Sequence, residues 1–230
     1  MLIKGLAKLT LLDYPEKVAC TIFTGGCNMR CPFCHNASLA VRAASVDTIA
    51  EDEVISFLKK RQGTLDGVCI TGGEPLLCHD IAEFIAKVKS LGYAVKLDTN
   101  GSFPEKLRLL IDAGLVDKVA VDIKNSPEKY AQTVGVPDFD LAPVYKTVEL
   151  LKEGKVDYEF RTTVVNELHS AEDFEAIGRW ISGSKAYFLQ CFNDSGDLIG
   201  ENLTAPTKSQ LDEYLHIVKK YVCNSHIRGI

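Results

Sequence analysis

The chain has 230 residues, of which 46% are hydrophobic and 25% are charged, a balance typical of a globular protein that buries its own core. Its 26 lysines and arginines stand against 31 aspartates and glutamates, a formal charge of −5, so no overall basic field favours nucleic acid or an anionic membrane as a partner. No signal peptide and no run of roughly 18 apolar residues is visible. We therefore expect a cytoplasmic protein whose eight cysteines are buried or bind metal.

Apolar and β-branched runs alternate along the chain with amphipathic helical segments. The predicted strands are residues 18–24, 67–71, 94–98, 118–124, 158–165 and 185–192. The predicted helices are residues 49–61, 79–91, 104–111, 141–151, 174–181 and 207–221. Strands that alternate with helices imply a parallel α/β sheet with right-handed crossovers. This pattern leaves two architectures open, an open doubly wound sheet and an incomplete barrel.

The first predicted strand leads directly into a loop with three cysteines. Cys27, Cys31 and Cys34 follow Gly25-Gly26 with the spacing C-x3-C-x2-C. Thiolates so close together suit a soft metal centre, and three of them leave a four-ligand site one ligand short. The other cysteines are scattered along the chain, and Cys20 and Cys69 lie within predicted strands, which favours burial over metal binding.

The residues around these cysteines leave other chemistries open. Residues 31–35 satisfy the C-x-x-C-H spacing of covalent haem, and their first four resemble a thiol redox motif, although neither needs Cys27. A zinc ion on the three cysteines and His35 is a third alternative. In that case the chain would be a zinc-stabilised module that binds a partner protein.

Polar residues also stand at the ends of the later strands. Because the carboxyl ends of parallel strands meet on one face, we expect them to lie together. They are Gly72, Gly73, Glu74, Asp98, Asn100, Asp122, Lys124, Arg161 and Gln190. A zwitterionic ligand would set its carboxylate against Lys124 or Arg161 and its amine against Glu74 or an aspartate. The pattern therefore indicates an amino-acid-like ligand.

The cysteine loop, with Phe33 before its last cysteine, and Gly72-Gly73-Glu74 together resemble two motifs of the radical S-adenosylmethionine (SAM) superfamily. More narrowly, the chain is similar to activating proteins of glycyl-radical enzymes, most of all those of anaerobic ribonucleoside-triphosphate reductase. This similarity runs through residues 5–15, 27–36, 71–76, 98–101 and 122–124. It implies a partial (β/α)6 barrel of the TIM type with parallel strands. It also implies a single domain over residues 1–230, with its core at about 16–200 and a C-terminal helix at about 207–221.

The same resemblance implies one [4Fe-4S] cluster on Cys27, Cys31 and Cys34, with SAM chelating the fourth iron. The implied reaction is reductive cleavage of SAM to a 5′-deoxyadenosyl radical. The implied cofactor-binding residues are Phe33, His35, Gly72, Gly73, Glu74, Asp98, Asn100, Asp122, Lys124 and Arg161. Gly73 and Glu74 would receive the methionyl amine, and Asp122 and Lys124 would contact the ribose or carboxylate. A monovalent cation would lie near Asp98 and Asp122.

The partner that the resemblance implies is a glycyl-radical enzyme, which supplies the abstracted hydrogen from a backbone glycine. No side chain of this chain is then needed as a general acid or base. An external low-potential electron donor such as flavodoxin or ferredoxin is also implied. An activase of pyruvate formate-lyase and a small-molecule radical SAM enzyme remain alternatives. Several activases carry an inserted ferredoxin-like domain after the first motif. Here only about a dozen residues separate Asn36 from the first predicted helix, so we expect no second cluster.

Overall fold

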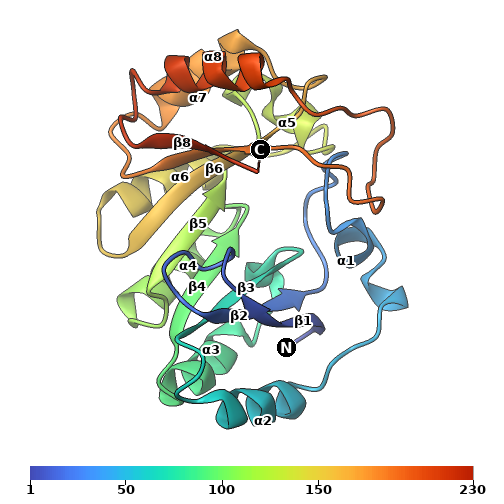
Figure 1. The fold of residues 1–230 in the computed structure, drawn as a ribbon, viewed down its shortest axis with the longest axis vertical. Coiled ribbons are helices and arrows are strands. Elements are labelled where there is room, and N and C mark those ends of the chain that lie inside the picture. Colours follow the sequence, from blue (N-terminus) through green and yellow to red (C-terminus); the bar gives the residue numbers. More distant parts are fainter. Residues whose placement is uncertain (230) are drawn as a thin grey trace.

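The computed structural model describes residues 1–229. Within these residues the strands form one eight-stranded sheet, whose order β1 to β8 follows the sequence. The sheet curves into an incomplete barrel with helices on its outer face (Figure 1). A doubly wound sheet reverses its strand order at a switch point, whereas this order never reverses. The barrel is therefore the correct choice of the two architectures.

The strands are β1 Ile3–Thr10, β2 Ala19–Thr24, β3 Gly67–Gly72, β4 Ala94–Thr99, β5 Lys118–Asp122, β6 Asp157–Val164, β7 Tyr187–Cys191 and β8 Ser225–Arg228. The α-helices are α1 Ala37–Val41, α2 Glu51–Arg61, α3 Ile81–Ser90, α4 Pro104–Asp112, α5 Tyr130–Thr133, α6 Ala142–Lys152, α7 Ala171–Trp180 and α8 Lys208–Val218. Short 3-10 helices cover η1 Ala43–Ser45, η2 Pro75–Leu77 and η3 Pro127–Lys129.

The six predicted strands are confirmed as β2 to β7, which pair in parallel. Two edge strands were not predicted. β1 pairs with β2 in antiparallel orientation, and β8 pairs with β7 in parallel. Because β1 and β8 do not pair with each other, a seam separates the two edges of the barrel.

Alternation along each strand separates an apolar outer face from a polar inner one. Leu97, Val121 and Phe160 are fully buried in the hydrophobic core cluster, which also contains apolar residues of the helices. Their neighbours Asp98, Asp122 and Arg161 line a cavity inside the barrel. Helix packing therefore fixes the strands, and the strands present the polar residues to the barrel interior.

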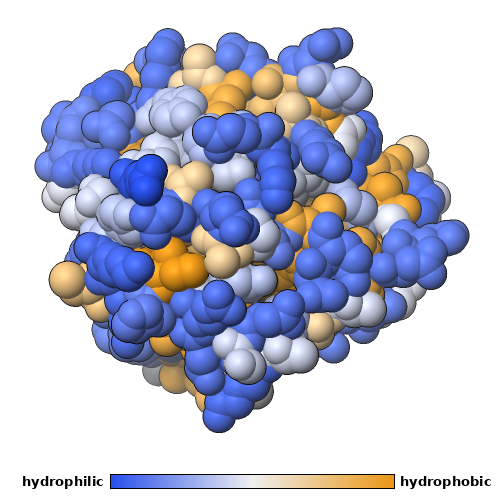
Figure 2. All heavy atoms as spheres, turned by 90° about the horizontal axis from the view of Figure 1, so that it is seen from above, coloured by the Kyte–Doolittle hydropathy of each residue, from blue (hydrophilic) through white to orange (hydrophobic). Residues whose placement is uncertain are grey.

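The surface seen from the side of α7 and α8 is mainly hydrophilic, and its apolar patches are separated from one another (Figure 2). Elsewhere, Leu9, Leu11 and Leu12 are exposed at the end of β1 and in the turn that follows it. Across residues 1–229, no helix has both the length and the apolar character that crossing a membrane requires.

Candidate functional site

The cysteine loop begins where β2 ends, and it is anchored there to the turn after β3. The backbone N–H of Glu74 donates to the carbonyl oxygen of Gly26 at 2.7 Å. This approach requires a glycine at position 73, because a Cβ there would lie 1.9 Å from the same oxygen. Gly73 thus allows the two loops to meet backbone to backbone.

Two further segments hold the same loop from its other sides. The N–H of Arg30 donates to the carbonyl of Val134 at 2.8 Å, and the N–H of Gly200 donates to the carbonyl of Pro32 at 2.8 Å. The contacts come from parts of the chain more than a hundred residues away in sequence. The cysteines therefore sit on a backbone frame that several elements define together.

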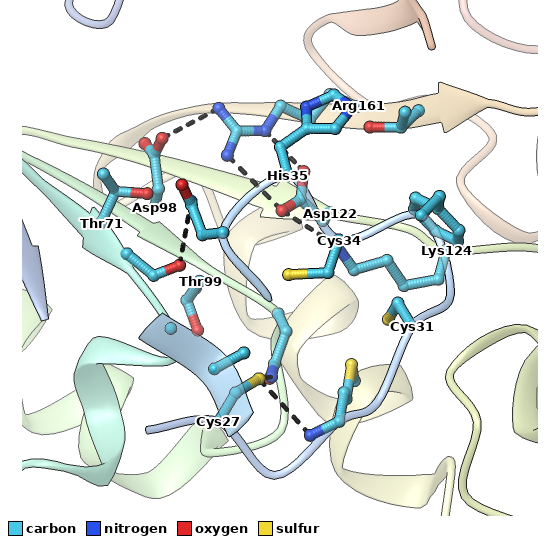
Figure 3. A pocket seen from close by; sticks show the side chains of 18 of the residues that line it. Cys27, Cys31, Cys34, His35, Thr71, Asp98, Thr99, Asp122, Lys124 and Arg161 are labelled. Atoms are coloured by element: carbon cyan, nitrogen blue, oxygen red, sulfur yellow. Dashed lines mark hydrogen bonds and ion pairs between the residues drawn. The ribbon is translucent and has the colours of Figure 1, made fainter. Parts of the chain in front are cut away.

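A cavity of about 360 Å³ opens between this loop and the strand ends. Of the predicted site residues, all except Glu74 line it: Cys27, Cys31, Phe33, Cys34, His35, Gly72, Gly73, Asp98, Asn100, Asp122, Lys124 and Arg161. Figure 3 shows the three thiol groups facing the charged side chains of the strands across this space. Gln190, at the sixth predicted strand end, lines it as well.

The three cysteines are free thiols, and their environment is partly desolvated. Burial raises the pKa of the Cys27 and Cys34 thiols and raises that of Cys31 to about 12, while the positive charge of Lys124 lowers each of these pKa values. Among residues 1–229, no three His, Cys, Asp or Glu side chains converge on the position of a single metal ion. In an iron–sulfur cluster, by contrast, each thiolate binds an iron of its own.

Five side chains of alternating charge form a row across β4, β5 and β6, which we call the charge ladder: Lys96, Asp98, Arg161, Asp122 and Lys124. Arg161 lies at its centre, with Nη1 at 2.9 Å from Asp98 Oδ2 and Nε at 2.6 Å from Asp122 Oδ1. Lys124 Nζ lies 3.2 Å from Asp122 Oδ2, and Lys96 pairs with Asp98. Each buried charge of the row therefore has an opposite charge beside it.

The electrostatic environment at the centre of the ladder favours the charged forms of Asp122 and Lys124. Burial by itself would raise the pKa of Asp122, but Arg161 and Lys124 hold this pKa well below its usual range. In the same way, burial would lower the pKa of Lys124, yet Asp122 keeps it above the ordinary value. Asp122 and Lys124 thus remain ionised near neutral pH, and Arg161 is the shared partner of both aspartates.

Glu74 is fully buried, and its carboxylate faces protein groups rather than the cavity. It accepts hydrogen bonds from the N–H of Leu76 at 3.0 Å, from Thr99 Oγ1 at 2.8 Å and from the N–H of Asn100 at 2.7 Å. Burial raises its pKa to about 7, although these donors oppose the shift. A carboxylate that receives the methionyl amine of SAM would be expected to face the cavity. The Glu74 carboxylate instead connects the end of β3 to the end of β4 through its hydrogen bonds.

Sequence reasoning missed some residues of the site. Lys96 is almost fully buried beneath Asp98, and its place two residues before Asp98 on the same strand was an available signal. Asp13 enters the cavity from the turn after β1 and accepts a hydrogen bond from Thr21 Oγ1. The strand before it had not been predicted, so the strand pattern gave no sign that Asp13 enters the barrel. Thr163 was not missed in this way, because strand alternation places it on the same side as Arg161, and it lines the cavity as well.

Comparison with known proteins gives a consistent picture. The sequence pattern of the Radical SAM superfamily matches residues 21–181. A protein of Methanocaldococcus jannaschii described as a glycyl-radical enzyme activating enzyme is 36% identical over 238 residues, covering 100% of this chain and 96% of its own length. The pyruvate formate-lyase-activating enzyme of Listeria monocytogenes is 33% identical over 121 residues, covering 47% of this chain and 48% of that protein.

Solved structures show the same fold at low sequence identity. A domain of the pyruvate-formate lyase-activating enzyme from Bacteroides vulgatus has a TM-score of 0.59 at 17% identity, covering 71% of this chain and 99% of that one. SuiB of Streptococcus suis, bound to S-adenosylmethionine, has a TM-score of 0.69 at 15% identity. This alignment covers 88% of the present chain and 48% of SuiB.

Proposed function

Because the chain belongs to the radical SAM superfamily, we propose that it cleaves SAM reductively and uses the 5′-deoxyadenosyl radical to install a glycyl radical on a partner enzyme. The observation that carries this proposal is the meeting of the three-cysteine loop and the charge ladder in one cavity. The full-length similarity to the Methanocaldococcus protein supports the activase assignment within the superfamily.

The residues present fit the cofactors that membership of the superfamily implies. Cys27, Cys31 and Cys34 offer three free thiols on one loop beside the cavity, and they would hold a [4Fe-4S] cluster. When bound, the cluster supplies the electron for SAM cleavage. Lys124 stands opposite the thiols and favours their deprotonated form, which binding to iron requires.

The rest of the cavity suits the zwitterionic end of SAM. We assign the carboxylate of SAM to the two cations of the ladder that line the cavity, Lys124 at its end and Arg161 at its centre. The backbone at Gly72 and Gly73 lines the cavity without a Cβ and leaves room for the amine to approach the carbonyl groups. Phe33 places its ring 5.9 Å from Lys124 Nζ and closes the same corner.

The charges in and behind this cavity nearly cancel, which favours a backbone glycine over a nucleotide as the second substrate. Three carboxylates face three cations across the barrel interior: Asp13, Asp98 and Asp122 against Lys96, Lys124 and Arg161. In the described part of the chain, each of these cations is paired with a carboxylate. A triphosphate needs surplus positive charge, whereas a peptide segment is neutral.

Several finer assignments rest on the motif resemblance. We propose anaerobic ribonucleoside-triphosphate reductase as the partner, with flavodoxin or ferredoxin as electron donor and the cytoplasm as location. Pyruvate formate-lyase is the alternative partner, which the similarity to the Listeria enzyme supports. A single domain over residues 1–230 and a monovalent cation near Asp98 and Asp122 stay predictions. Arg161 already joins these two aspartates in the structure.

Anaerobic reconstitution tests the proposal. We expect about four irons per chain and, with a strong reductant and SAM, release of 5′-deoxyadenosine. Mixing with each candidate partner should then produce a glycyl radical, observed by electron paramagnetic resonance (EPR), in the cognate enzyme. Binding of one zinc ion without an iron–sulfur cluster would refute the assignment. SAM cleavage without a radical on either candidate would refute these partners but leave the superfamily chemistry in place.

A further inference from the structure

The side-chain amide of Asn100 lines the cavity and also contacts the sulfur of Cys27. Asn100 follows β4 directly and is buried. Its Nδ2 lies 3.8 Å from Cys27 Sγ and 2.8 Å from Asn28 Oδ1, and both contacts are hydrogen bonds. The N–H of Met29 donates to the same sulfur at 3.4 Å. Cys27 Sγ thus receives one backbone donor and one side-chain donor.

The orientation of this amide is fixed by the backbone. The N–H of Ser102 donates to Asn100 Oδ1 at 3.0 Å. Because a backbone N–H can only donate, the oxygen of the amide has to face Ser102, and the NH2 group has to face Cys27 and Asn28. A flipped amide would set two donors against each other. The donor role of Asn100 toward the sulfur is therefore determined by the structure.

The amide is also part of a closed ring of hydrogen bonds. Asn28 Nδ2 donates to Ser102 Oγ at 3.0 Å, which completes the path from Asn100 through Asn28 and Ser102 back to Asn100. Separately, the backbone N–H of Asn100 donates to Glu74 at 2.7 Å. The side chain is thus held on both its polar atoms while the main chain is anchored elsewhere, so a change of side chain leaves the main-chain anchor in place.

We propose that Asn100 is a positioning residue whose amide donates a hydrogen bond to the cluster-binding thiolate of Cys27 and thereby raises the reduction potential of the cluster. This inference rests on the proposed function. Hydrogen bonds to the sulfurs of an iron–sulfur cluster stabilise the more negative, reduced state. Within residues 1–229, Cys27 is the one of the three loop cysteines whose sulfur accepts a side-chain hydrogen bond. The proposed effect on the reduction potential therefore acts through the Cys27 ligand.

Potentiometric titration of the reconstituted protein, followed by EPR of the reduced cluster, measures this effect. Asn100→Leu removes the donor at similar size, and we expect a reduced-to-oxidised ratio about tenfold lower at a fixed potential, which corresponds to 59 mV for one electron. Asn100→Asp keeps the acceptor for Ser102 but places a negative charge beside the sulfur. We expect its potential to fall further than that of Asn100→Leu.

The matched control is Ser102→Ala. This variant removes the Oγ acceptor of Asn28 but keeps the Ser102 N–H that orients Asn100. We expect its potential to equal that of the wild type, since the donor to Cys27 remains. A role in loop stability alone predicts similar shifts for Ser102→Ala and Asn100→Leu, and that result would overturn the proposal.

A second measurement detects the contact between the amide and the cluster directly. Wild-type protein carrying ¹⁵N in its asparagine side chains should show a ¹⁵N coupling in pulsed EPR of the reduced cluster, and Asn100→Asp should lose it. Absence of this coupling in the wild type, or equal potentials of all variants at equal iron content, would overturn the inference while leaving the activase proposal intact. A wild type that holds no iron–sulfur cluster would overturn both.

Discussion

The two walls of the cavity are built by different physical means. The cysteine loop is held by backbone hydrogen bonds and by close contacts at glycine, such as that between Gly73 and Gly26. The charge ladder is held by ion pairs between side chains, with Arg161 at its centre. The first wall depends on shape and tolerates almost no added volume, whereas the second depends on charge balance and tolerates no unpaired charge.

The largest effect should come from the centre of the ladder. Arg161→Met keeps the unbranched apolar stem of the side chain but leaves Asp98 and Asp122 without their shared cation. Asp98 keeps Lys96 and Asp122 keeps Lys124, but the three carboxylates of the barrel interior then face only two cations. Because an uncompensated buried charge is costly, we expect the free energy of unfolding to fall by about 4 kcal/mol. Urea denaturation measures this change. Adding Asp122→Asn to the same chain should restore part of the loss, and a further loss in the double variant would contradict the charge-balance interpretation.

The cysteine loop should respond to volume instead. Gly73→Ala places a methyl group 1.9 Å from a backbone oxygen that has no rotamer to change. We expect a loss of about 3 kcal/mol in the free energy of unfolding and far less iron bound after reconstitution. Gly5→Ala is the matched control, because its new methyl would approach the Phe23 side chain no closer than 3.3 Å. Equal iron content in the two variants would show that the loop is not held by shape.

Glu74 and Asp122 sharpen the comparison because their pKa values shift in opposite directions. Neutral donors surround Glu74, and burial raises its pKa from 4.5 to about 7. Between pH 4.5 and about pH 7, the folded protein therefore keeps a proton on Glu74 that the unfolded chain has already lost. This contribution to stability is complete below pH 4.5 and is lost as pH rises through about 7.

Glu74→Gln should remove this pH dependence. The glutamine cannot ionise, so the fall in unfolding free energy between pH 5 and pH 7.5, about 2 kcal/mol in the wild type, should shrink in the variant. Chemical denaturation at several pH values measures it. Asp122 behaves with the opposite sign: its lowered pKa adds stability above the unfolded value, and this is lost only as pH falls through the folded pKa. An unchanged slope in Glu74→Gln would assign the effect to another group.

The smallest effect should come from an ion pair at the surface. Arg108 Nη2 lies 3.2 Å from Glu153 Oε1, and both side chains are about two-fifths exposed, at 41% and 39%. Arg108→Met should cost about 0.5 kcal/mol, because water screens the pair. Thermal or urea unfolding of this variant and of Arg161→Met under the same conditions compares the two losses. A loss as large as that of Arg161→Met would mean that burial does not decide the strength of these pairs.

Much of this cavity could be predicted because the sequence changes from apolar to charged residues where each strand ends. Asp98, Asp122 and Arg161 stand where apolar alternation gives way to charge, so their shared face followed from the strand pattern alone. β1 and β8 were missed for the opposite reason: β1 carries two lysines and an exposed leucine, and β8 has four residues. An edge strand need not be apolar on both faces, and its sequence then lacks the usual signal.

The direction of individual side chains could not be predicted in the same way. Glu74 points away from the cavity because its carboxylate accepts hydrogen bonds from the N–H of Asn100 and the hydroxyl of Thr99. These donors lie at the end of the next strand. The contact of Asn100 with Cys27 likewise joins residues 73 positions apart. Such choices depend on the geometry between strands, which the local sequence pattern does not contain.

The seam between β1 and β8 gives the barrel a mechanical property that a closed barrel lacks. Widening a closed barrel would rupture a complete row of inter-strand hydrogen bonds, whereas this sheet already ends on each side of the seam. Its curvature can therefore change slightly at every strand pair while each pairing stays intact. An elastic opening of this kind would let a loop of another folded protein enter and leave without any part of the barrel unfolding.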